Sequence, residues 1–454
     1  MKGFRTYSAL GWLLAAIAAC ILLSCGKEED FRISGESGVT GGSRGPRNEF
    51  QETRRVLLFY ESGFNDLTTW LDEDMNKELV KGNVPGGSRN DDVLLVFTKL
   101  MNGSSKAPVK SYLKRLYTDK SGNVIADTLV TYPEDVMANT PETMRKVLTY
   151  VKEEFPAKGY GLVFSSHGSG WLPEGYFYNP STFENEHKAV SERKLSPRSM
   201  RAPVPTEDVT EDPFHGMTRS IGKEEAAKDG SFEGKEMTTE EFASGIPFHL
   251  DYIFFDMCHS AGIEILYALK DKADYVGCSP TEVLSDGMFN YTTITDYLFK
   301  TPEADLEGLF KASFDMYDSY AGIYRSSTVM LARTDGLDHL AEVCKEMFEK
   351  YRDEIASLDY RKVQGYYRHS LNRHYFFDLE DVFIRCGASD EDLASIRETL
   401  DGCTVWKAST PMFMEDFSIG TYSGISIYLP SGGTALLDSY YMQESWNKAT
   451  ELVK

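Results

Sequence analysis

The chain has 454 residues, a formal net charge of −22 at pH 7 and 41% hydrophobic residues. This length and composition are typical of a globular protein with a large core, and the length favours two to three domain-sized units. A surface this acidic repels nucleic acid and anionic lipid. The charge therefore argues against nucleic-acid binding, and it either attracts cationic partners or serves only solubility.

Residues 1–24 are predicted to be a signal peptide. Two basic residues come first, and the apolar run from Leu10 to Leu23 is shorter than the roughly 20 residues that span a bilayer. The run ends in Leu-Leu-Ser-Cys, which resembles a bacterial lipobox, so Cys25 is the expected lipidation site. We expect an exported lipoprotein of the bacterial cell envelope, joined to the membrane by this lipid; a plain signal peptide or a single-span anchor are the alternatives. The Gly/Ser-rich stretch 25–53 predicts a flexible tether.

Apolar runs and amphipathic periodicity then alternate along the chain, which predicts an α/β domain with a largely parallel sheet over residues 54–300. The clearest helix begins at Thr140-Pro141, with Thr at the N-cap and Pro at the first helical position. A second helix start is the capping box Thr238-x-x-Glu241. The predicted strands and hairpin lie at 56–60, 93–97, 111–132 (hairpin), 160–165, 251–255 and 274–278.

Two regions depart from this alternation. Residues 174–245 are poor in apolar side chains and contain five prolines, which predicts a mobile insertion with regular structure resuming only at Thr238. Residues 301–454 predict a more helical C-terminal region, with amphipathic runs at 305–320, 336–357 and 390–400 and a strand at 424–430.

Five cysteines lie beyond the signal segment, widely spaced and without a CxxC pair. This pattern predicts neither a disulfide framework nor a zinc site, and at least one thiol must be unpaired within the chain. No other metal motif is present in the sequence, so we expect no metal site and no cofactor.

Two reactive side chains directly follow predicted strands. His167 comes after the strand at 160–165, and Cys258 comes after the strand at 251–255. Because reactive groups in parallel sheets gather beyond the carboxyl ends of the strands, we expect the two to meet. Thiol nucleophiles need a nearby base, so the pair predicts nucleophilic catalysis, although a lone His or Cys is more often structural.

The segments HGSGW and DMCHSAGIEILYALKDKADYVGCSPTEVLSDGMFNY resemble the clostripain family of cysteine peptidases, and the similarity extends over about residues 54–450. The resemblance implies a caspase-like three-layer sandwich, a thioester formed on Cys258, and His167 as the base. It also implies an oxyanion hole built from the backbone N–H groups of Gly168 and Cys258. Some members use calcium, for which this sequence shows no site. Met257 and His259 depart from the family pattern, and His259 is expected to point away from the thiol.

Asp256 is predicted to select the substrate side chain before the scissile bond (P1). In an extended strand, residues two apart face the same side about 7 Å apart, which puts its carboxylate beside Cys258. Such a carboxylate would accept Arg or Lys, so protein or peptide substrates with basic residues are expected. The alternative is a structural carboxylate that caps the following helix.

Self-cleavage between His167 and Cys258 is a further expectation, because clostripain-like enzymes are often cut there. The candidate sites are four basic residues of the insertion: Arg193, Lys194, Arg198 and Arg201. An insertion that is never cut, or is cut by another protease, is the alternative. Two rival functions stay open: an inactive surface binding lipoprotein on a peptidase fold, and an enzyme that transfers the acyl group to an amine rather than to water.

Overall fold

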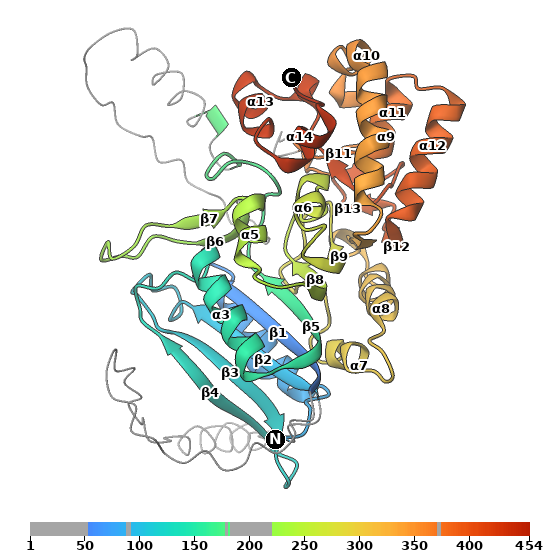
Figure 1. Ribbon diagram of the computed structural model, residues 1–454. Helices are drawn as coiled ribbons and strands as arrows, with labels where there is room; N and C mark the ends of the chain where they lie inside the picture. Colours follow the sequence, from blue (N-terminus) through green and yellow to red (C-terminus); the bar gives the residue numbers. More distant parts are fainter. Residues whose placement is uncertain (1–52, 88–91, 178–179, 182–219, 370–373) are drawn as a thin grey trace, which may run out of the picture. The chain divides into compact units, whose positions relative to one another are not determined.

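The computed structural model describes residues 53–87, 92–177, 180–181, 220–369 and 374–454. Its central sheet has the strand order β12-β10-β9-β8-β5-β1-β2-β3-β4 (Figure 1). The strands of this sheet are β1 Thr53–Gly63, β2 Val93–Leu100, β3 Ser111–Thr118, β4 Val124–Tyr132, β5 Ala157–Ser165, β8 Leu250–Asp256, β9 Ala273–Cys278, β10 Thr328–Arg333 and β12 Thr404–Ser409.

The middle of the sheet is parallel, as predicted. Strands β2, β1, β5, β8 and β9 run in the same direction. The predicted hairpin over 111–132 is present as β3 and β4, which add two antiparallel strands at one edge. At the other edge β10 and β12 pair antiparallel. Both of these strands come from beyond residue 300. The predicted boundary between a peptidase domain, 54–300, and a C-terminal region, 301–454, stays a prediction.

Helices cover both faces because the central strands are apolar on both sides. In β1, Leu58 packs into one core and the adjacent Phe59 into the other. The second core is covered by α7 Ile294–Leu298, α8 Leu306–Asp318 and helical turns at 74–81 that continue α2 Thr68–Glu73. The first core is covered by α3 Pro141–Glu154, α5 Thr239–Gly245, α6 Ile263–Ala268, α9 Leu337–Lys350, α10 Arg352–Ala356, α11 Leu379–Arg385, α12 Asp390–Gly402, α13 Ala435–Tyr441 and α14 Ser445–Thr450. The predicted three-layer α/β sandwich is therefore confirmed.

Both predicted helix starts are confirmed. The Thr140 hydroxyl accepts a hydrogen bond from the Thr143 backbone N–H at 3.2 Å, at the start of α3. The capping box of Thr238 and Glu241 is complete at the start of α5. These contacts satisfy backbone N–H groups that have no partner inside the helix.

Two strand predictions need correction. The strand expected at 424–430 is only the two-residue β15, Ser426–Ile427, which pairs with β11, Phe377–Asp378, outside the main sheet. Gly424 has a positive φ of 84°, and Pro430 has no N–H to donate, so a longer strand is blocked at both ends. Another short hairpin, β13 Met412–Phe413 with β14 Phe417–Ser418, lies in the same C-terminal part.

The second correction concerns the insertion. Residues 174–237 were expected to lack regular structure, but β6 Ile221–Glu224 and β7 Lys235–Met237 form a hairpin there. Strands of four and three residues carry almost no periodic signal. Their pairing depends on contacts distant in sequence, such as the bridge between Gly168 and Ile221. Residues 178–179 and 182–219 of the insertion lie outside the described residues.

Candidate active site

Neighbouring strands bring His167 and Cys258 together. Strands β5 and β8 are neighbours in the sheet (Figure 1). In their pairing Ser165 lies opposite Asp256, and both segments continue two residues further, to His167 and Cys258. Both side chains line one cavity. The equal distance of the two residues from a paired position explains why they reach the same level beyond the sheet edge.

Gly168 shows how closely the two loops approach. A Cβ added there would lie 2.3 Å from Cγ of Met257 and 2.7 Å from the carbonyl oxygen of Cys258. Only glycine fits without displacing the nucleophile loop. Among the described residues, no backbone hydrogen bond uses the N–H of Gly168 or Cys258. Neither N–H is therefore used by the backbone hydrogen-bond network of the described residues.

His167 has a partner that the sequence did not indicate. Its Nε2 lies 2.6 Å from Oδ1 of Asp66, which follows β1 at the same edge of the sheet. The hydrogen bond and charge of His167 hold the pKa of Asp66 at about 2 despite the opposing effect of burial. Burial in turn lowers the pKa of His167, and Asp66 opposes that shift. Applying the strand-end rule to β1 as well as to β5 and β8 would have found Asp66.

The surroundings of the half-buried Cys258 favour its neutral thiol. Burial, with the nearby negative charge of Glu282, raises its pKa to about 12. The Val283 backbone N–H points at Sγ from 3.2 Å. Because burial also lowers the pKa of His167, both shifts favour thiol and imidazole over thiolate and imidazolium.

His259 is directed elsewhere, as expected. Its ring stacks on Phe376 with centroids 4.2 Å apart and planes at 9°. Its Nδ1 lies 3.1 Å from the carbonyl oxygen of Pro280. The residue adopts a left-handed backbone conformation with φ of 51°. This turn sends the imidazole into the core, away from the cavity.

Two carboxyl groups are part of the lining of the cavity. Asp256 and Asp74 both line it, and each residue is only 8% exposed. Asp256 accepts hydrogen bonds from the Met288 backbone N–H and the Tyr291 hydroxyl, each at 2.7 Å. It therefore does not cap the following helix. A Cβ on Gly287 would lie 2.6 Å from Asp256, so this approach requires glycine.

These carboxyl groups resist ionisation. Burial raises the pKa of Asp256 to about 6, and burial with repulsion from Asp256 raises the pKa of Asp74 to about 9. Behind them, burial followed by the charges of Asp74 and Asp256 raises the pKa of Glu61. The sequence missed Asp74 and Glu61, because a helical Asp and a strand Glu carry no motif.

Several predicted features fall on other parts of the chain. Cys25 and the four candidate cleavage residues lie outside the described residues.

Within the described ranges no group of three His, Cys, Asp or Glu side chains is arranged to hold a metal ion. The expectation of no cofactor, with calcium left open, stays a prediction. None of the described helices is long and apolar enough to cross a membrane.

Comparisons with known proteins agree with this geometry. A family model described as the clostripain family, Peptidase_C11, matches residues 59–183 and 219–450, which is more than half of the chain. No curated protein sequence matches significantly. A solved structure described as an inactive zymogen C11 protease from Parabacteroides distasonis is 24% identical, with a TM-score of 0.67, covering 87% of this chain and 97% of that one.

A second solved structure is described as a secreted C11 cysteine protease from Bacteroides thetaiotaomicron in complex with an irreversible peptide inhibitor. It is 22% identical, with a TM-score of 0.65, covering 88% of this chain and 99% of that one. At these identities both structures show a shared fold. The predicted caspase-like fold class is thereby confirmed.

Proposed function

The chain belongs to the clostripain family and is a cysteine endopeptidase acting on protein or peptide substrates, and we propose that Cys258 is its nucleophile and His167 its general base. The observation that carries this assignment is that both side chains line one cavity beyond paired strands. The transfer of the acyl group to an amine in place of water would use the same two residues.

The proposed reaction starts from the neutral pair. Nε2 of His167 is engaged by Asp66, so Nδ1 takes the thiol proton as Sγ attacks the carbonyl carbon. The negative charge on the carbonyl oxygen is stabilised by the N–H groups of Gly168 and Cys258. The imidazolium, stabilised by Asp66, then protonates the leaving amine and a thioester remains. Water, deprotonated by His167, hydrolyses the thioester and restores the thiol.

We propose Asp256 and Asp74 as the subsite for a basic P1 side chain. Two buried carboxyl groups on one cavity wall, each with a raised pKa, repel one another when both are ionised. A guanidinium or ammonium between them would relieve that repulsion and hold both groups ionised. A neutral or acidic P1 side chain would leave the repulsion in place.

A panel of fluorogenic peptides with Arg, Lys, Leu or Asp at P1 tests this assignment. Wild type should prefer Arg and Lys, and Asp74→Asn and Asp256→Asn should lose that preference mainly through KM. Asp72 lies on α2, two residues before Asp74, and is exposed, so it supplies a control. Asp72→Asn should behave as wild type. Preference of the wild type for Leu or Asp would reject a basic subsite.

The N-terminal segment and the insertion support two further proposals. The lipobox-like sequence supports export to the cell envelope with a lipid on Cys25, and Cys25→Ser should move the protein from the membrane to the soluble fraction. The basic residues of the insertion fit the proposed subsite, which supports self-cleavage between His167 and Cys258, with Arg193, Lys194, Arg198 and Arg201 as candidates.

A further inference from the structure

The short strand β6 lies between the two loops that carry His167 and Asp66. On one side, the Gly222 N–H donates to the carbonyl of His167 at 2.9 Å, and the Lys223 N–H donates to the Ser166 hydroxyl at 3.0 Å. On the other side, the Asn65 side-chain amide donates to the carbonyl of Lys223 at 2.8 Å. The two loops are therefore connected through the backbone of β6.

This bridging matters because the contact between the loops is short and directional. His167 and Asp66 come from β5 and β1, and their hydrogen bond is 2.6 Å long. The neighbours of both residues, Ser166 and Asn65, bond to the same residue of β6, Lys223. A shift of β6 would change the separation of the loops, and with it the orientation of the imidazole.

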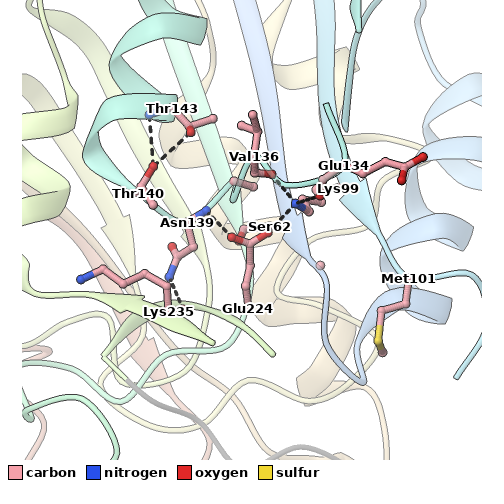
Figure 2. Close-up of polar contacts among 12 residues, drawn as sticks. Ser62, Lys99, Met101, Glu134, Val136, Asn139, Thr140, Thr143, Glu224 and Lys235 are labelled. Atoms are coloured by element: carbon pink, nitrogen blue, oxygen red, sulfur yellow. Dashed lines mark hydrogen bonds and ion pairs between the residues drawn. The ribbon is translucent and has the colours of Figure 1, made fainter. Parts of the chain in front are cut away.

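One buried ion pair ties β6 to the sheet. Glu224 of β6 lies 3.9 Å from the Nζ of Lys99 on β2, and both side chains are fully buried. Figure 2 shows Lys99 also donating to the carbonyls of Val136 and Glu134, and the Asn139 backbone N–H donating to Glu224 at 2.9 Å. The ammonium further lies over the ring of Phe232, 4.6 Å from its centroid.

Neither charge of this pair is used in the proposed mechanism. Burial lowers the pKa of Lys99 and raises that of Glu224, while each partner opposes the shift of the other. Removing one partner leaves an uncompensated charge in the core, whereas removing both leaves none. A single substitution should therefore displace β6 more than a double one.

We propose that Lys99 and Glu224 are positioning residues: their ion pair fixes β6 so that its backbone holds His167 against Asp66 in the orientation for proton transfer. The inference rests on the proposed role of His167 as the base. It adds that this base is oriented by β6, a strand that contains neither the nucleophile, nor the base, nor a residue of the proposed P1 subsite.

The test uses full-length protein with Glu224→Gln, Lys99→Met and the double variant, assayed on a Lys peptide. Each single variant should lower kcat roughly 10- to 100-fold with KM within about twofold of wild type, as misplaced catalytic groups do. The acid limb of the pH profile of kcat/KM should shift to lower pH, since Asp66 raises the pKa of His167. The double variant should recover most of kcat.

The matched control is Glu444→Gln, another buried glutamate, which accepts a hydrogen bond from the Thr239 hydroxyl on α5. It should keep wild-type kcat and pH profile whatever its effect on Tm. If the single variants lower Tm but keep kcat and the pH profile below their unfolding range, the pair is only structural and the inference is overturned. A double variant as slow as the singles would also overturn it.

His167→Ala in the same assay separates this inference from the proposed function. If His167→Ala is inactive while Glu224→Gln behaves as wild type, only the positioning role is wrong. If His167→Ala retains activity, the assignment of the base is wrong, and the inference with it.

Discussion

Replacing Asp74 by Asn should stabilise the protein while weakening its binding of basic substrates. The carboxyl group is almost fully buried, and burial followed by repulsion from Asp256 raises its pKa from 3.8 to about 9. A group with a raised folded-state pKa makes the folded protein bind more protons than the unfolded chain. Stability therefore falls as pH rises from about 4 to about 9.

The size of the effect follows from the same shift. Only the interval between the unfolded-state pKa of 3.8 and pH 7 counts at pH 7. It spans about three pH units at about 1.4 kcal/mol each, so the buried Asp74 carboxyl lowers stability by up to about 4 kcal/mol. Water entry and protonation of Asp256 would relieve part of this cost. A chain of this length should then gain about 2 to 5 °C in Tm in the Asn variant.

Thermal unfolding of wild type, Asp74→Asn and the control Asp72→Asn at pH 4, 7 and 8 measures this directly. The Asp74→Asn gain should be near zero at pH 4 and grow at pH 7 and 8, and Asp72→Asn should show no such trend. A lower Tm for Asp74→Asn at pH 7, or an equal gain at every pH, would refute the reasoning.

Three other predictions concern the reaction. Cys258→Ala and His167→Ala should fold normally and lose amidase activity by orders of magnitude, whereas His259→Ala should stay active; a dead His259→Ala with an active His167→Ala would reverse the assignment of the base. Asp66→Asn should lower kcat roughly 10- to 100-fold and move the acid limb of kcat/KM to lower pH, and an unchanged profile would remove Asp66 from the mechanism. Purified wild type should separate into two associated fragments while Cys258→Ala stays whole, and nicking of the variant at the same bond would assign the cut to another protease.

The central sheet and the meeting of His167 with Cys258 could be predicted because they depend on patterns within single strands. Each residue follows a continuous apolar run, and a parallel sheet brings such positions to one edge. The direction of His259 was also predictable from its adjacency to Cys258. Its side chain is in fact held by Phe376 and Pro280, which only the structure shows.

What the sequence could not indicate depends on contacts between distant segments. Asp74 is an acidic residue of a surface-like helical pattern, and only the folded chain brings its carboxyl into the same cavity as Asp256. β6 is too short to show periodicity, and its hydrogen bonds to the loop of His167 decide its structure. Neither feature lies in a long apolar run, which is where the sequence carries its periodic signal.

Active-site labelling tests the central claim most directly. A peptidyl chloromethyl ketone with Lys at P1 should modify one thiol per molecule, with activity lost in proportion, and peptide mapping should place the label on Cys258. Cys386 is the internal comparison, since it is also partly exposed and its pKa is raised to about 11 by burial. Label on Cys386, or activity that survives full modification of Cys258, would contradict the account.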